Sequence, residues 1–325
     1  MLSVFVSRGT SLERVALEEG APPPEEAVWI DLVKPTLQED KLVEGLLGIA
    51  VPTREEMQEI EVSSRLYVEN GARYMTATLM CHADTATPIT TPVTFILSAH
   101  RLLTVRYDAP RPFAIVEHKL ARGVSPKLSG ETVLTDLLDA VIDRAADILE
   151  RAGMEVDAIS HSIFEPEAEE GDPPSYKDVL KALGRKGDLT SKVRESLVSI
   201  GRVLLFLANE ADTMRWPKET RAHLQSMRRD TASLSDHATY LSSKITFLLD
   251  AMLGVVNIEQ NAIIKIFSIA AVIFMPPTLV ASVYGMNFHH GMIELEWIYG
   301  YPFALLLIVV AAIVPIVFFK WKKWL

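Results

Sequence analysis

The chain has little sulfur chemistry and no recognisable catalytic pattern. Cys81 is the one cysteine among 325 residues, which excludes a disulfide or a thiolate metal cluster within one chain, and we expect it to pack in a strand. The glycines form neither GxGxxG nor GxxxxGK, and the histidines form no HExxH pattern. His82 with Asp84, and His100 near Asp108, lack the spacing of a nucleophile and its base. We therefore expect no enzymatic activity.

Formal charge is missing from two long stretches. No charged residue occurs from Ile266 to Tyr284 or from Tyr299 to Phe319. Each stretch has the roughly 20 residues that cross about 30 Å of hydrocarbon as a helix. The sequence therefore predicts a multi-pass membrane protein with spans at about 266–284 and 299–319 and a connecting loop at 285–298.

The loop between the spans has no lysine or arginine and carries Glu294 and Glu296. Basic residues lie at the opposite ends of the spans: Lys265, Lys320, Lys322 and Lys323. Because positive charge is enriched on the cytoplasmic side, both termini are expected there. Met1 to Val6 is too short for the apolar part of a signal peptide, so the large N-terminal part is expected to stay in the cytosol.

That N-terminal part is acidic. Residues 262–325 hold four lysines and two glutamates, a net charge of +2, so the total of −10 leaves −12 on residues 1–261. An acidic domain argues against nucleic acid as a partner and is compatible with divalent cations. The alternative is that these carboxylates form a solvated surface.

Residues 1–125 predict a mixed α/β domain, because short β-rich runs alternate with helical patterns. Thr53 with Glu56 three residues later is a capping-box pattern. The predicted helices are Leu37 to Leu47 and Thr53 to Ile60. The predicted strands are Leu2 to Val6, Ala27 to Leu32, Arg65 to Val68, Ala72 to Met80, Pro92 to Ser98 and Leu102 to Arg106.

Residues 126–262 predict long helices, because apolar residues recur there at three and four spacing. Breaks are expected at Glu165 to Pro174 and at Trp216-Pro217. No proline follows Pro217 until Pro276, so one helix can run from this region into the first span. The expected fold class is α+β: an α/β domain at 1–125, a helical region at 126–262 and a membrane domain at 263–325.

One face of the first span carries its polar residues. At about 100° per residue, Ser268, Thr278 and Ser282 share a stripe with Asn261. Hydrocarbon offers hydroxyls no partner, so the stripe is expected to face a partner helix or an aqueous path. Two spans cannot enclose a pore alone, and cyclic symmetry with the first span at the axis is the economical arrangement. The predicted pore-lining set is Asn261, Ile264, Phe267, Ser268, Ala271, Met275, Thr278 and Ser282.

An ordered series of short segments crosses both spans: Asn257 to Asn261, Ile264 to Ser268, Pro276 to Ser282, Tyr284 to Phe288, Glu294-Leu295, Trp297, Gly300 to Pro302 and Lys323 to Leu325. This series resembles the CorA family of magnesium transporters, specifically its enterobacterial type. The likeness extends to Ala27 to Val33 and Thr53 to Glu61, so it covers essentially the whole chain.

The resemblance implies a homopentameric channel for Mg²⁺ influx, and also for Co²⁺ and Ni²⁺, across the bacterial inner membrane. It implies a funnel of long helices, gating by cytosolic Mg²⁺ and no further cofactor. Gly285, Met286 and Asn287 match the family's selectivity motif. Mg²⁺ gives up its waters reluctantly, so the Asn287 carbonyl is suited to accept hydrogen bonds from coordinated water, while Gly285 permits a tight turn.

The resemblance also implies roles for other residues. Thr278 and Ser282 mark polar levels in the pore, Met275 and Phe267 mark hydrophobic constrictions, and Asn261 marks the inner mouth. Lys320, Lys322 and Lys323 resemble a cytosolic basic collar, or are simple topology anchors. The regulatory carboxylates cannot be aligned, and the candidates by charge and position are Asp230, Asp236 and the Glu165 to Asp172 cluster.

The sequence departs from the family pattern at His289 to Ile293. The pair His289-His290 is either solvated or able to recruit Co²⁺, Ni²⁺ or Zn²⁺, for which imidazole is a better ligand than for Mg²⁺. Zinc transporters of the ZntB type share Gly-Met-Asn and are the closest alternative. A membrane-anchored cation sensor without conduction is the other.

Overall fold

The computed structural model describes residues 1–16, 21–123, 128–164, 175–286 and 297–322. The chain divides into two compact units, Met1–Leu249 and Asp250–Leu325. The division at residues 125 and 262 expected from the sequence stays a prediction.

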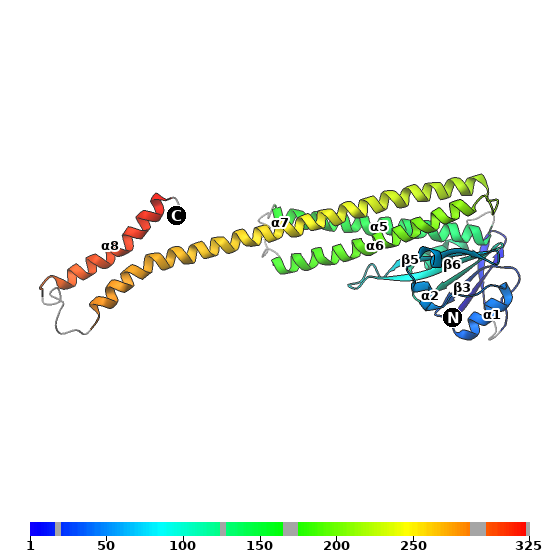
Figure 1. The fold of residues 1–325 in the computed structure, drawn as a ribbon, viewed down its shortest axis with the longest axis horizontal. Coiled ribbons are helices and arrows are strands. Elements are labelled where there is room, and N and C mark those ends of the chain that lie inside the picture. Colours follow the sequence, from blue (N-terminus) through cyan, green and yellow to red (C-terminus); the bar gives the residue numbers. More distant parts are fainter. Residues whose placement is uncertain (17–20, 124–127, 165–174, 287–296, 323–325) are drawn as a thin grey trace. The chain divides into compact units, whose positions relative to one another are not determined.

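The first unit contains a seven-stranded mixed sheet with the order β2-β1-β3-β7-β6-β5-β4 (Figure 1). Its strands are β1 (Leu2–Arg8), β2 (Ser11–Val15), β3 (Ala27–Val33), β4 (Leu66–Glu69), β5 (Ala72–Cys81), β6 (Ile89–Ser98) and β7 (Arg101–Arg106). β3 and β7 pair in parallel, and the other described neighbours are antiparallel. The six predicted strands are confirmed, whereas β2 was not predicted.

Helices cover both faces of the sheet because side chains alternate along each strand. One face carries Val4, Ile30 and Leu103, which pack with Val43 of α1 (Leu37–Leu47) and Met57 of α2 (Arg54–Gln58). The other face carries Phe5, Trp29, Met75, Phe95 and Leu102, which pack with the remaining helices of this unit. The expected mixed α/β architecture is confirmed.

Local capping fixes where the short helices start. Thr53 Oγ1 accepts a hydrogen bond from the backbone N of Glu56 at 3.3 Å, and Glu56 Oε2 accepts one from the backbone N of Thr53 at 2.8 Å. The predicted capping box is therefore confirmed, although α2 ends at Gln58 rather than at Ile60. α3 (Val62–Arg65) and α4 (Arg111–Ala121) were not predicted.

Three long helices form the rest of the first unit and begin the second. They are α5 (Gly130–Phe164), α6 (Tyr176–Glu210) and α7 (Lys218–Tyr284). Their apolar faces share a core that includes Leu149, Val193 and Leu241. The predicted break at Trp216-Pro217 is confirmed, whereas residues 165–174 lie outside the described residues.

The predicted continuity of the chain into the first span is confirmed, because α7 is one helix of 67 residues that contains Pro276 and Pro277. It is followed by α8 (Gly300–Trp321), a helix of 22 residues. These two helices are long and apolar enough to cross a membrane, and their most apolar windows are 0% and 6% buried within the chain. Side chains this apolar and this exposed need lipid or further protein around them.

Candidate ion pathway

The predicted pore-lining residues share one exposed face of α7. Phe267 and Met275 leave 71% and 68% of their surface uncovered in the single chain. The other six, Asn261, Ile264, Ser268, Ala271, Thr278 and Ser282, are exposed as well. The unbroken helix therefore gives these side chains the common face that the sequence periodicity predicts.

The opposite face of the same helix segment is partly covered. Ile269, Ile273, Pro276, Val280 and Tyr284 have intermediate exposure. At about 100° per residue, these positions centre roughly half a turn from the polar stripe. Within the second unit, the polar stripe thus lies on the side of α7 that the chain leaves open.

Thr278 offers an oxygen acceptor on this stripe. Its Oγ1 donates a hydrogen bond to the backbone carbonyl of Phe274 at 2.7 Å. This bond satisfies the hydroxyl proton inside the helix, as threonine often does, and leaves both lone pairs of the oxygen available to accept. An available acceptor suits a hydrated cation, because the waters bound to a cation point their protons outward.

The selectivity motif begins where α7 ends. The backbone N of Gly285 donates to the carbonyl of Ala281 at 2.9 Å, and that of Met286 donates to Val283 at 3.3 Å. A Cβ built on Gly285 would lie 3.0 Å from the Ala281 carbonyl oxygen. The φ of Gly285 is not positive, so the feature that favours glycine here is this contact, which a side chain would have to widen by a few tenths of an ångström.

Several predicted site residues lie outside the described residues. These are Asn287, Glu294, Glu296, Lys323, the pair His289-His290 and the Glu165 to Asp172 cluster. Of the predicted basic collar, Lys320 and Lys322 are exposed at the end of α8, and Lys322 Nζ lies 5.5 Å from the centre of the Trp321 ring.

The two aspartates proposed as regulatory residues differ in their surroundings. Asp230, on α7, lies near α5 carboxylates, among them that of Asp143. The pKa of Asp143 is raised, first by burial and then by the negative charges of Asp139 and Asp147. The charge of Asp230 adds to this rise. Asp236 is exposed. Among the described residues, no group of three His, Cys, Asp or Glu side chains is arranged to hold a metal ion. The α5 aspartates were missed, although their spacing of four residues was visible in the sequence.

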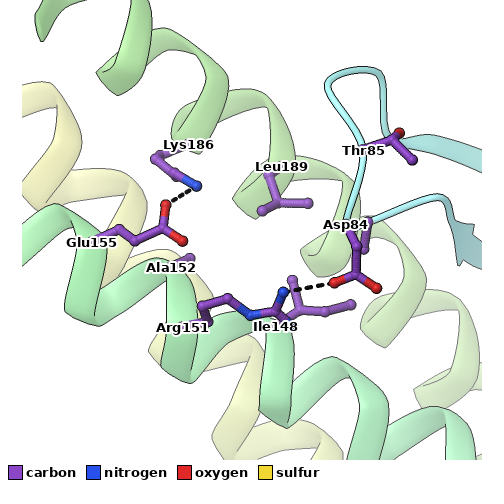
Figure 2. A pocket seen from close by; sticks show the side chains of 9 residues that line it. Asp84, Thr85, Ile148, Arg151, Ala152, Glu155, Lys186 and Leu189 are labelled. Carbon is purple, nitrogen blue, oxygen red and sulfur yellow. Dashed lines mark hydrogen bonds and ion pairs between the residues drawn. The ribbon is translucent and has the colours of Figure 1, made fainter.

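A cavity of about 150 Å³ lies between the β5–β6 hairpin and the helices α5 and α6 (Figure 2). Arg151 Nη1 lies 2.6 Å from Asp84 Oδ1, and Lys186 pairs with Glu155. Arg144 and Arg111 also contact Asp84, at 2.6 and 3.0 Å. The charged groups of this cavity therefore satisfy one another and pin the hairpin to α5.

A mixed α/β unit, long helices and two exposed apolar helices of membrane length define a two-span membrane protein with a large polar domain. The sequence model of the family described as "CorA-like Mg2+ transporter protein" matches residues 24–323. The chain belongs to this family, as the sequence resemblance predicted.

Relatives and a solved structure agree over the full length. The magnesium transport protein CorA of Escherichia coli K12 is 35% identical over 330 residues, and that of Yersinia pseudotuberculosis is 36% identical, each match covering 100% of both chains. The structure of the CorA magnesium transporter from Methanocaldococcus jannaschii has a TM-score of 0.75 at 20% identity, covering 100% of this chain and 99% of that one. The structural likeness shows a shared fold.

Proposed function

We propose that this chain assembles into a homo-oligomeric channel that admits Mg²⁺ across the bacterial inner membrane. The observation that carries the proposal is the full-length match to magnesium transport proteins, which includes both spans and the N-terminal unit. The exposed polar stripe on α7 supports it, because a path for a hydrated cation needs oxygen acceptors across the hydrocarbon.

The pathway lies on the axis of a closed ring, with five copies as the family resemblance implies. Each copy contributes the α7 stripe to the axis and leaves the uniformly apolar α8 toward lipid. The open side of α7 supports this arrangement, because the described residues of a single copy leave the stripe exposed. Both termini lie in the cytoplasm, as the lysines at 265, 320, 322 and 323 indicate.

Selection takes place at Gly285-Met286-Asn287. A ring of Asn287 carbonyls accepts hydrogen bonds from the waters of Mg²⁺ and does not strip them. Neutral oxygens suit a conducting site, because carboxylates would hold the ion too firmly to release it. The end of α7 at Tyr284 and the close contact at Gly285 support a selectivity motif that starts at the end of this helix.

Cytosolic Mg²⁺ closes the channel by neutralising carboxylates of the acidic first unit. The raised pKa of Asp143 supports this: burial is its largest cause, and the like charges of Asp139 and Asp147, with Asp230, add to the rise. A ligand shifts a closed-to-open equilibrium only by its differential affinity for the two states, so weak sites repeated around a ring suit a sensor of millimolar Mg²⁺.

The test is ion flux into liposomes that carry the full-length protein and a Mg²⁺ indicator. Asn287→Ala should abolish or severely reduce Mg²⁺ uptake with assembly intact, whereas Asn209→Ala, which removes an exposed amide from α6, should leave uptake unchanged. Co²⁺, Ni²⁺ and Zn²⁺ are then added in competition. Zinc uptake in preference to Mg²⁺ would make the protein a zinc transporter, and absence of uptake for every ion would make it a sensor without conduction.

A further inference from the structure

A second cavity, of about 390 Å³, lies where the sheet edge meets α6. β4 pairs with β5 only from Ala72 to Met75, so beyond Met75 this edge of β5 has no strand partner among the described residues. A side chain of α6 serves as the hydrogen-bond acceptor there: Ser199 Oγ accepts a hydrogen bond from the backbone N of Thr78 at 2.9 Å. The cavity therefore has a fixed floor within the first unit.

The walls of this cavity are cationic. Arg65 comes from the end of α3, and Arg194 and Arg202 come from α6. Glu195 is the one carboxylate in the lining, so the formal charge of the lining residues is +2. None of the three arginines forms an ion pair with a described residue.

The floor offers further hydrogen-bond donors. Thr78 and Ser199 are only 7% and 8% exposed. Thr78 Oγ1 accepts from Arg65 Nη1 at 3.1 Å, and Ser199 Oγ accepts from the backbone N of Thr78. Each hydroxyl thus keeps its own O–H to donate, and the described residues supply no acceptor for either. Both hydroxyls line the cavity, so their O–H groups are available to an acceptor-rich ligand.

The charges around Arg65 also favour an anionic ligand in this cavity. Burial lowers the pKa of Arg65, Glu195 opposes this, and the neighbouring charge of Arg202 adds to the lowering. Arg194 and Arg202 are exposed and Arg65 is half-buried, so the cavity is open to solvent. Like charges around it repel one another, and an anion between them would relieve that repulsion.

We propose that this cavity binds a small phosphate-bearing anion of pyrophosphate size or larger. Guanidinium groups bind phosphate oxygens through two parallel hydrogen bonds, and hydroxyls supplement them. The volume falls in the range of about 300–1,000 Å³ that is typical of ligand sites, which exceeds the needs of a single phosphate. Ile60 and Val198 give the rim an apolar side for an organic group attached to the phosphates.

The cavity itself is a poor site for Mg²⁺, because its lining contains a single carboxylate, Glu195. Polyphosphates bind Mg²⁺ through the same oxygens that the arginines would use. The metal-free anion is therefore the preferred ligand, and added Mg²⁺ should weaken binding by competing for those oxygens.

Isothermal titration of the full-length protein in detergent tests the proposal, with inorganic phosphate, pyrophosphate and ATP as probes and NaCl holding the ionic strength constant. Pyrophosphate and ATP should bind saturably and more tightly than inorganic phosphate. Arg194→Gln and Arg202→Gln should each weaken binding about tenfold, since each removes a charge-assisted pair. Arg202→Lys should recover part of the loss, because the charge stays while the fork is lost.

Two further variants separate binding from folding. Glu195→Gln should tighten binding several-fold, because it removes the one negative charge of the lining. Arg228→Gln removes an exposed arginine of α7 that does not line the cavity, and should leave binding unchanged. Absence of saturable binding would overturn the proposal, as would equal weakening by Arg202→Gln and Arg228→Gln or equal affinity for inorganic phosphate and pyrophosphate.

Discussion

Arg106 holds the buried carboxylate of Asp31 with one edge of its guanidinium, formed by Nε and Nη2. Arg106 Nη2 lies 2.8 Å from Asp31 Oδ2, and Arg106 Nε lies 3.1 Å from Oδ1. Thr104 Oγ1 donates to the same Oδ1 at 2.7 Å. The pair joins β3 to β7, which is the parallel step in the described sheet. Removing one partner would leave a charge buried at the centre of the first unit.

We therefore expect Asp31→Ala to lower the free energy of unfolding by about 3–5 kcal/mol, the usual cost of breaking a buried ion pair from one side. The measurement is the thermal unfolding midpoint of the protein in detergent. Glu13→Ala, which breaks the exposed Arg8–Glu13 pair, serves as control and should cost no more than about 1 kcal/mol. Equal shifts in the two variants would contradict a structural role for the Asp31–Arg106 pair.

The contact at the end of α7 predicts a specific defect for Gly285→Ala. The new Cβ would press on the Ala281 carbonyl oxygen at 3.0 Å, so the chain beyond Tyr284 must shift. Liposome uptake of Mg²⁺ should fall roughly several-fold, because a shift of a few tenths of an ångström displaces the start of the selectivity motif, and functional groups must be held within about 0.5 Å. Gly254→Ala is the matched control, since nothing lies within 4 Å of its Cβ and alanine favours a helix. Loss of uptake in both variants would remove the special role of Gly285.

The single cysteine permits a direct test of the α7 stripe. Cys81 is 2% exposed, and burial raises the pKa of its thiol to about 12, so it should be inert to thiol reagents. A charged methanethiosulfonate should block Mg²⁺ uptake through Ala271→Cys, which lies on the exposed stripe. Ala270→Cys lies one residue earlier, on a partly covered face, and the same reagent should leave Mg²⁺ uptake by this variant unchanged. Block at residue 270 without block at residue 271 would place the pathway on the other side of the helix.

The contacts of Asp84 with Arg111, Arg144 and Arg151 predict that the stability of the fold depends on pH. The hydrogen bond from Arg151, and then that from Arg144, lowers the pKa of Asp84 to about 2, and burial opposes the shift. A lowered pKa in the folded state stabilises the fold above the unfolded value of about 3.9, and this contribution is lost as the pH falls toward 2. Asp84→Asn should therefore lower the unfolding midpoint at pH 7, and its difference from the parent should shrink between about pH 4 and pH 3.

The control for this effect is Asp188→Asn, which removes one partner of an exposed pair with Lys192 on the same helix. Its difference from the parent should be small at pH 7. A difference for Asp84→Asn that stays constant from pH 7 to pH 3 would show that the arginines do not hold the ionised carboxylate.

Local patterns explain which elements were predictable from the sequence. The shared exposed face of α7 followed from helical periodicity, because α7 has no break between Asn261 and Ser282. β2 was missed because Glu13 and Arg14 are exposed on an edge strand, where packing does not impose an apolar pattern. α4 was missed although Phe113, Val116 and Leu120 have helical spacing.

Sites built from distant segments were out of reach. Arg65 and Arg202 meet only because α6 docks on β5, and no single-sequence pattern links them. The same holds for Asp230 and the α5 aspartates. The spacing of the aspartates on α5 is visible in the sequence, but their proximity to Asp230 of α7 depends on how the two helices pack. Periodicity thus predicts which face of a helix is special, whereas tertiary packing decides which neighbours that face receives.

The open edge of β5 sets an order on folding during synthesis. Thr78 and Ser199 are separated by 121 residues, so the whole sheet leaves the ribosome well before α6 is available to cover that edge. At about 5–20 residues per second, the interval lasts many seconds. An uncovered edge strand is a template for pairing with another nascent chain. Neighbouring nascent chains on a polysome are therefore most exposed to mispairing before α6 docks, and a chaperone that shields β5 would have its greatest effect in that interval.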